Sequence, residues 1–159
     1  MNEIPTLGQL APDFELRDDE GRSHRLSDRR GHYTVVYFYP EDDTPGCTRE
    51  ACAFRDAQAS IRKLGAVVLG VSGDSLASHG KFKARHKLNF ALLADVDKAV
   101  ATRYGAWGEK MMYGRKVTGM IRSTFVIDAE GVVRKVFPRV RVEGHAEQVL
   151  AALSGLVGS

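Results

Sequence analysis

Cys47 and Cys52 are the only thiols in the 159-residue chain, and both lie in the run YFYPEDDTPGCTREACAFRD. Thr44 suits the N-cap of a helix and Pro45 its first position, which puts Cys47 in the first turn. There the positive end of the helix dipole favours the thiolate, which is the nucleophilic form of cysteine. We expect the Thr44 hydroxyl to accept a hydrogen bond from the Cys47 N–H, and the pattern indicates a reactive thiol.

The spacing of the two cysteines decides what they can do together. In an intact helix, residues five apart are separated by roughly 8–9 Å at Cα and point about 140° apart. A disulfide needs Cα atoms within about 7 Å. Either Cys47 and Cys52 never pair, or the first turns of the helix unwind to let them. Pro45 and Gly46 at the start of the helix favour such fraying.

Other roles for the cysteines remain open at this point. A free cysteine is often a small buried apolar residue. A structural zinc site needs four ligands, commonly with closely spaced cysteine pairs, and the chain has no second pair. No two histidines are spaced as zinc ligands usually are, so we expect no metal; the histidines are His24, His32, His79, His86 and His145. The lack of a C-x-x-C motif argues against an ordinary thioredoxin.

Composition and charge narrow the class of protein. With 43% apolar and 27% charged residues, the chain is predicted to form a single globular domain over residues 1–159. A net charge of +3 without a basic helix or an aromatic ribonucleoprotein box predicts no nucleic-acid binding. No run approaches the ~20 apolar residues of a membrane span, and the start does not resemble a signal peptide. We therefore expect a cytoplasmic protein, where cysteine pairs favour redox work.

The elements that position the cysteines follow from the hydrophobic pattern. Buried strands are predicted at 33–39, 66–72, 89–93 and 123–128. Helices are predicted at 45–64, 75–88, 97–104 and 143–153, followed by a frayed tail, SGLVGS. Hairpins are predicted near the start, from residue 14, and at 123–137.

The order of these elements predicts the fold class. Strands that alternate with helices imply a parallel sheet with right-handed crossovers. A βαβ unit followed by ββα is the thioredoxin arrangement. We therefore predict an α/β, thioredoxin-like fold, with a mixed central sheet flanked by helices and an N-terminal β-hairpin extension.

Three blocks of the sequence resemble one family. The pattern Pro40-x-x-x-Thr44-x-x-Cys47 resembles the active-site signature of the peroxiredoxins. The runs FYPEDDTPGCTREACAFRD, YGAWGEKMMYGRKVTGMIRSTFVID and GQLAPDFELRDDEG are similar to the bacterioferritin comigratory protein group, also called peroxiredoxin Q. The similarity spans nearly the whole chain, with its blocks in the usual order.

This resemblance implies a thiol peroxidase that reduces hydrogen peroxide and organic hydroperoxides. Cys47 would attack the peroxide and become a sulfenic acid. Pro40, Thr44, Gly46 and Arg122 would contact the peroxide, together with backbone N–H groups near Cys47. Fixed donors are needed because the transition state spreads negative charge over sulfur and oxygen.

Two further residues take roles from the same resemblance. Arg122 matches the arginine that stabilises the thiolate and polarises the peroxide. Glu50, one helical turn after Cys47, matches the position that holds this arginine. Arg49 is the alternative cation, but its direction on the helix is less favourable.

Cys52 matches the resolving cysteine of members with C-x4-C spacing. The resemblance implies that it attacks the Cys47 sulfenate, and that a thioredoxin-like dithiol reduces the resulting disulfide. No cofactor, whether metal, haem or flavin, is implied, and the group is often monomeric, so we expect a monomer. Two alternatives on the same fold stay open: a thiol–disulfide exchanger and a redox sensor.

Overall fold

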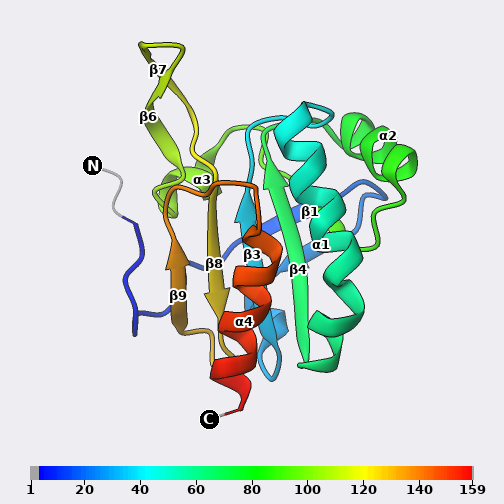
Figure 1. Cartoon of the computed structure of the whole chain (residues 1–159), viewed down its shortest axis with the longest axis vertical. Helices are drawn as coiled ribbons and strands as arrows, with labels where there is room; N and C mark the ends of the chain where they lie inside the picture. The colour runs from blue at the N-terminus through cyan, green and yellow to red at the C-terminus, as the bar shows by residue number, and fades with distance from the viewer. Residues whose placement is uncertain (1–3, 159) are drawn as a thin grey trace.

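The structure, a computed structural model, describes residues 4–158 of the chain. Within this range a seven-stranded sheet has the order β2-β1-β5-β4-β3-β8-β9 (Figure 1). Its strands are β1 (Glu15–Asp18), β2 (Ser23–Arg25), β3 (Tyr33–Phe38), β4 (Ala66–Ser72), β5 (Ala91–Ala94), β8 (Ser123–Ile127) and β9 (Val133–Phe137). The helices are α1 (Pro45–Lys63), α2 (Leu76–His86), α3 (Ala99–Arg103) and α4 (His145–Val157), with a 3-10 turn, η1, at Leu26–Arg29.

The sheet is mixed, as the sequence predicted. Strands β3, β4 and β5 are parallel, while β8 runs antiparallel to β3 and β9 antiparallel to β8. The N-terminal hairpin β1–β2 extends this sheet, because β1 pairs antiparallel with β5. The α/β, thioredoxin-like fold class with an N-terminal hairpin extension is confirmed.

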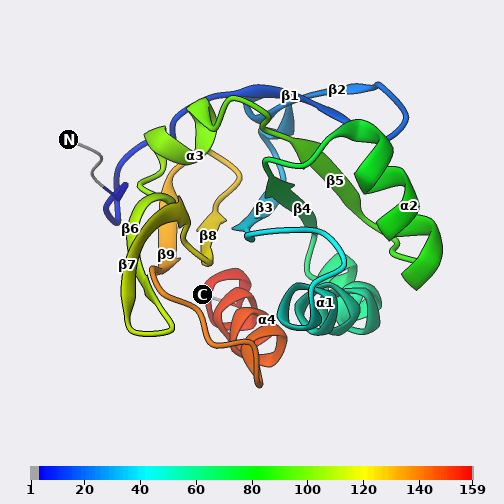
Figure 2. The ribbon, with the colours of Figure 1, turned by 90° about the horizontal axis from the view of Figure 1, so that it is seen from above.

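The central strand β3 divides the core into two layers. Successive side chains of a strand point to opposite faces, so Val35 and Tyr37 face one way and Val36 and Phe38 the other. Helices α1 and α4 pack on the first face, and α3 covers the second (Figure 2). All four β3 side chains are fully buried, which explains the nearly continuous apolar run in this strand.

Helix α1 begins just beyond the carboxyl end of β3 and carries both cysteines. Thr44 is its N-cap in an extended conformation, and Pro45 is its first residue, as predicted. Phe54 and Ile61, seven positions apart on one face, are fully buried, and the Phe54 ring stacks on Tyr37 at 4.7 Å between centroids. This packing fixes the position of the helix over the sheet.

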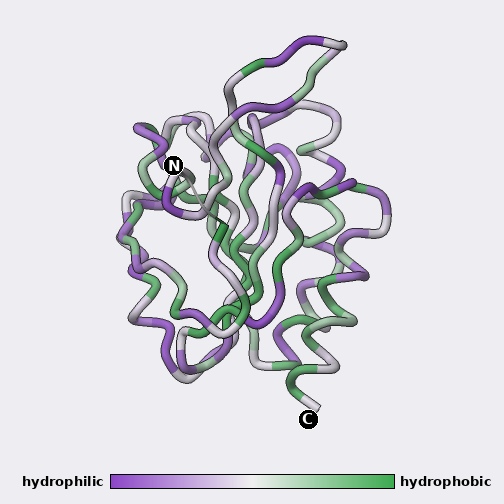
Figure 3. The backbone as a smooth tube through the Cα atoms, turned by 90° about the vertical axis from the view of Figure 1, so that its left-hand side faces the viewer, coloured by the Kyte–Doolittle hydropathy of each residue, from purple (hydrophilic) through white to green (hydrophobic). Residues whose placement is uncertain are grey.

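A third hairpin, β6 (Trp107–Met112) and β7 (Arg115–Met120), was not predicted. It projects beyond the rest of the molecule (Figures 1 and 3). Tyr113 and Gly114 form its two-residue turn with φ of 53° and 78°, the two positive values that a type I′ turn requires. The strand pattern was missed because this hairpin packs little against the core, so its side chains do not alternate cleanly between apolar and polar.

The expected frayed tail is wrong for most of its length. Helix α4 continues to Val157, and Leu156 packs against the core cluster that contains Leu153. The apolar stripe therefore runs one turn further than predicted. The last tail residue, Ser159, lies outside the described residues.

Candidate active site

Cys47 lies in the first turn of α1 and is buried, with 1% of its surface exposed. It belongs to the same core cluster as Tyr37, Tyr39 and Ala51. The first intrahelical bond runs from the Thr48 N–H to the Thr44 carbonyl, at 2.8 Å. The amides of Gly46 and Cys47 precede that bond, so they belong to the group of first-turn donors that a helix leaves for other acceptors.

The expected cap from the Thr44 side chain is wrong. Its hydroxyl makes no capping hydrogen bond to α1 and instead donates to the Glu41 carbonyl, at 2.9 Å. This bond closes the turn that precedes the helix. The hydroxyl oxygen keeps its acceptor capacity, and the Cys47 N–H is left uncapped by Thr44.

Arg122 joins the thiol to a buried carboxylate. Its Nη2 donates to the Cys47 sulfur at 3.3 Å, and its Nη1 donates to Glu50 Oε1 at 2.6 Å. Arg122 lies between β7 and β8, and its carbonyl accepts a bond from the Val140 N–H at 2.9 Å, which anchors the segment. Arg122 and Glu50 thus meet Cys47 as the sequence predicted, whereas Arg49 is exposed.

Burial and the neighbouring charges act in opposite directions on the pKa values of Glu50 and Arg122. Burial raises the pKa of Glu50 to about 7, although the Arg122 guanidinium opposes this shift. For Arg122, burial lowers the pKa, but the charges of Glu50 and Cys47 outweigh it and the pKa is raised. The guanidinium is therefore charged at all relevant pH values, and Glu50 is its full counter-ion only above about pH 7.

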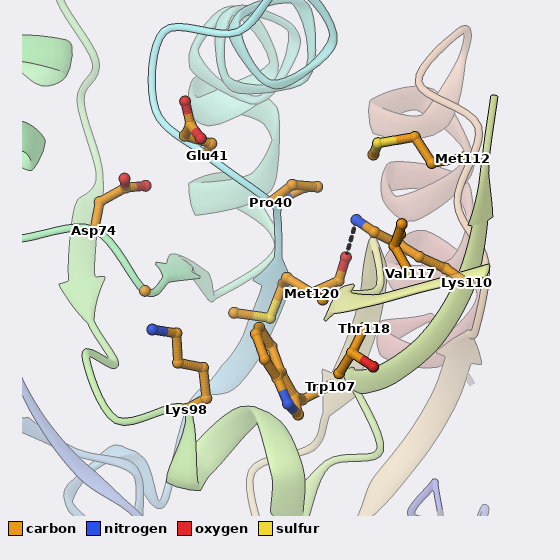
Figure 4. A pocket seen from close by; sticks show the side chains of 12 residues that line it. Pro40, Glu41, Asp74, Lys98, Trp107, Lys110, Met112, Val117, Thr118 and Met120 are labelled. Carbon is orange, nitrogen blue, oxygen red and sulfur yellow. Dashed lines mark hydrogen bonds between the residues drawn. The ribbon is translucent and has the colours of Figure 1, made fainter. Parts of the chain in front are cut away.

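Gly46 and Pro40, the other predicted peroxide contacts, lie in different surroundings. Gly46 approaches Arg122 so closely that a Cβ at this position would lie 3.3 Å from Nη2. Pro40 follows β3 and lines a cavity of about 490 Å³ between its loop and the β6–β7 hairpin (Figure 4). Neither Cys47 nor Arg122 lines this cavity, so the cavity does not contain the reactive groups.

Lys110 is a site neighbour that the sequence did not single out. Its Nζ donates to the Met120 carbonyl at 2.6 Å on the wall of the cavity (Figure 4). Burial lowers the pKa of Lys110, and the nearby charge of Arg122 lowers it further. No sequence signal could have found it, because its position depends on the unpredicted hairpin.

Cys52 is half-buried and, like Cys47, is a free thiol. Both residues lie within the unbroken helix α1, where ideal geometry separates their Cα atoms by roughly 8–9 Å. The helix must therefore change shape before the two sulfurs can bond.

One cluster of two carboxylates and a histidine has the composition of a metal site. Among residues 4–158, atoms of Asp42, Asp74 and His79 lie within 4.8 Å of one another. Their oxygens are already used: Asp42 Oδ2 lies 2.7 Å from His79 Nδ1, and Asp74 Oδ2 accepts from the Ser72 hydroxyl at 2.6 Å. The group is a hydrogen-bonded network and does not fit a cation.

Comparisons with known proteins find relatives over nearly the whole chain. The sequence model of the AhpC/TSA family matches residues 7–136. A putative peroxiredoxin bcp of Coxiella burnetii is 48% identical over 147 residues, 92% of this chain and 97% of the relative. Peroxiredoxin Bcp of Bacillus subtilis is 47% identical over 150 residues, 94% of this chain and 96% of the relative.

Solved structures of the same group of proteins superpose on this chain over nearly its whole length. The bacterioferritin comigratory protein of Xanthomonas campestris, studied for its alkyl peroxide reduction activity, superposes with a TM-score of 0.88 at 40% identity, over 97% of this chain and 98% of that one. A peroxiredoxin Q structure from Xylella fastidiosa superposes with a TM-score of 0.91 at 33% identity, over 97% and 98% of the two chains.

The fold and the buried thiol paired with Arg122 define a thiol peroxidase of thioredoxin-like architecture. The chain belongs to the AhpC/TSA family, as a peroxiredoxin of the Bcp, or peroxiredoxin Q, group. Among the described residues, no helix combines the length and apolar character needed to cross a membrane.

Proposed function

We propose that Cys47 reduces hydrogen peroxide and organic hydroperoxides, and that Cys52 resolves the oxidised thiol through a Cys47–Cys52 disulfide. The single observation that supports this best is the half-buried Arg122 guanidinium, which lies 3.3 Å from the buried Cys47 sulfur. A fixed positive charge at a helix start stabilises the thiolate and the charge that develops on peroxide oxygen.

In the first step the Cys47 thiolate attacks the terminal peroxide oxygen. The S–O bond forms as the O–O bond breaks, and the departing alkoxide or hydroxide takes a proton to become an alcohol or water. Arg122 and the Gly46 and Cys47 amides donate to the peroxide oxygens, while the Thr44 hydroxyl orients the peroxide. Glu50 acts through Arg122, whose fork it holds in place at 2.6 Å.

In the second step the first turns of α1 unwind and bring the two sulfurs together. The Cys52 thiolate attacks the Cys47 sulfur, so that an S–S bond forms, the S–O bond breaks, and hydroxide leaves as water. The half-buried position of Cys52 supports this role, because its thiol needs little displacement to reach solvent or a partner.

An external dithiol then reduces the disulfide by exchange and restores both thiols. A thioredoxin-like protein in the cytoplasm fits this chemistry, because the disulfide lies in a segment that is exposed once unwound. We propose that the enzyme works as a monomer, since both cysteines of the cycle belong to one helix.

Stopped-flow mixing of the reduced protein with hydrogen peroxide, followed by mass analysis, tests the proposal. We expect a fast reaction at Cys47 and then one Cys47–Cys52 bond per chain. A parallel assay of peroxide consumption under steady dithiol separates a peroxidase from a thiol–disulfide exchanger, which turns over disulfides but not peroxide. A reduced protein that fails to consume peroxide would refute the assignment.

A further inference from the structure

The loop between β3 and α1 is fastened to α2 by one buried carboxylate. Asp42 is 7% exposed and accepts hydrogen bonds from three side chains. They are Tyr39 Oη at 2.6 Å, Ser78 Oγ at 2.8 Å and His79 Nδ1 at 2.7 Å. The backbone N–H of Asp42 also donates to Asp74 Oδ2, at 2.9 Å. This loop leads directly to Thr44 and the first turn of α1.

His79 is the charged partner in this network. It is fully buried on α2, with Nδ1 facing the Asp42 carboxylate and Nε2 facing the Leu93 carbonyl of β5 at 2.9 Å. Neither of these acceptors can donate, so both ring nitrogens must carry a hydrogen, and the ring is an imidazolium.

The surroundings of His79 favour this charge. The other titratable groups that face it are Asp74, from the β4–α2 loop, and Tyr39, whose Oη lies 3.5 Å from Nδ1. Burial lowers the pKa of His79, but the hydrogen bond and charge of Asp42 outweigh it and leave the pKa raised. A buried ion pair of this kind is costly to break by removing one partner.

We propose that His79 is a positioning residue for the peroxidase reaction: its buried ion pair with Asp42 fixes the β3–α1 loop and thereby keeps the first turn of α1 wound and ready for peroxide. The inference rests on the proposed function of Cys47 and adds to it a residue from another helix. His79 touches neither the thiol nor the peroxide, and acts only through Asp42 and the loop.

A wound first turn has opposite effects on the two steps of the cycle. Peroxide attack needs Thr44 and the Cys47 amide in place, whereas disulfide formation needs the turn to unwind. If the anchor is lost, the first step slows and the second does not, because the unwound form becomes more populated. A loss of stability elsewhere in the fold does not slow the first step while sparing the second.

The next residue in the loop provides a matched control. Asp43 also pairs with α2, through His86 Nε2 at 3.1 Å and Arg85 Nη1 at 3.7 Å. These partners are partly or largely exposed, and exposed ion pairs contribute little to stability. Asp42→Asn and Asp43→Asn are thus the same chemical change at adjacent positions, one in a buried pair and one at the surface.

Stopped-flow kinetics of the two steps tests the proposal on the full chain. In Asp42→Asn and His79→Gln we expect oxidation of Cys47 to slow by at least about tenfold, since small misplacements of reacting groups carry large costs. Disulfide formation after oxidation should be as fast as in the wild type or faster. Asp43→Asn and the remote core variant Val133→Ala should leave both steps within about twofold.

Imidazole nitrogen NMR on the unmodified protein gives a second readout that needs no variant to fold. We expect both ring nitrogens of His79 to be protonated at pH 7. A neutral His79 ring would overturn the proposal, and so would oxidation rates in Asp42→Asn equal to those of Asp43→Asn. Failure of the proposed function is distinguishable, because wild-type Cys47 would then not react with peroxide at all.

Discussion

The two cysteines of α1 lie in one helix but in different surroundings. Cys47 is 1% exposed and receives a hydrogen bond from the half-buried Arg122. Cys52 is half-buried, and the nearby Arg55 is a partly exposed side chain that donates to Asp56 Oδ1 at 3.0 Å and to the His86 carbonyl at 2.6 Å. A cation therefore lies near each thiol, but Arg122 bonds the Cys47 sulfur directly, whereas Arg55 bonds these two oxygen acceptors.

This difference shows how a short sequence interval separates two chemical roles. A nucleophile that must discriminate peroxides needs a dry site with fixed donors, because such donors act most strongly away from water. A thiol that must travel to its partner needs freedom and access. Helix α1 provides the first condition at its start and the second little more than one turn later.

Replacing Cys47 or Cys52 should have the largest effects and should separate the roles of the two thiols most clearly. We expect Cys47→Ser to lose all reaction with peroxide. Cys52→Ser should oxidise at nearly the wild-type rate and sustain turnover with a small-thiol reductant, but form no internal disulfide. Peroxide consumption and intact-mass analysis measure both outcomes. Full activity in Cys47→Ser would contradict the assignment.

Replacing the cation beside Cys47 should have the next largest effect. Arg122→Lys keeps the charge but loses the planar fork that reaches both Cys47 and Glu50. We expect the rate constant for oxidation by peroxide to fall about 100-fold, as for other lost transition-state donors. Arg134→Lys is the control, because Arg134 is exposed and pairs only with Asp128, at 3.4 Å. Stopped-flow rates equal in both variants would show that Arg122 is not part of the site.

The carboxylate behind the arginine should matter in a pH-dependent way. At pH 8 we expect Glu50→Gln to oxidise about tenfold more slowly, because Arg122 loses its charged partner. Wild-type Glu50 takes up a proton as the pH falls through about 7, so the ratio of wild-type to variant rates should shrink towards pH 6. Stopped-flow rates of both proteins from pH 6 to 8 measure this ratio. A ratio that is constant with pH would mean that Glu50 stays ionised throughout.

Stiffening the first turn of α1, just before Cys47, should have the smallest effect. Gly46→Ala raises helix propensity by up to about 1 kcal/mol, so disulfide formation should slow by up to about fivefold. Its Cβ also lies 3.3 Å from Arg122 Nη2, so the oxidation step is measured separately from disulfide formation. Gly155→Ala makes the same change in α4, where a Cβ meets nothing within 4 Å, and should leave this step unaffected. Rates of disulfide formation by quenched mass analysis compare the two. Equal rates in Gly46→Ala and wild type would mean that unwinding does not limit resolution.

Much of the site could be predicted from the sequence because its signals are local or carried by the family pattern. Thr44 and Pro45 specify the helix start, and the apolar run of β3 specifies a buried strand ahead of it. The meeting of Arg122 with Cys47 spans 75 positions and came only from the resemblance. No local pattern encodes a contact over that distance.

The failures share a cause in tertiary contacts. The Thr44 hydroxyl closes a loop turn instead of capping the helix, because the Glu41 carbonyl is within reach. No role was predicted for His79 from the sequence, yet it is fully buried and bonded at both nitrogens. A histidine on a polar-looking helix gives no sign of a carboxylate 37 positions earlier.

The central claim is that α1 must unwind between the two cysteines before they can bond. Amide hydrogen exchange of the reduced and the disulfide forms tests it most directly. We predict that residues 46–52 lose protection in the disulfide form, while the part of α1 around Phe54 and Ile61 keeps it. A Cys47–Cys52 disulfide with unchanged protection across residues 46–52 would contradict the claim.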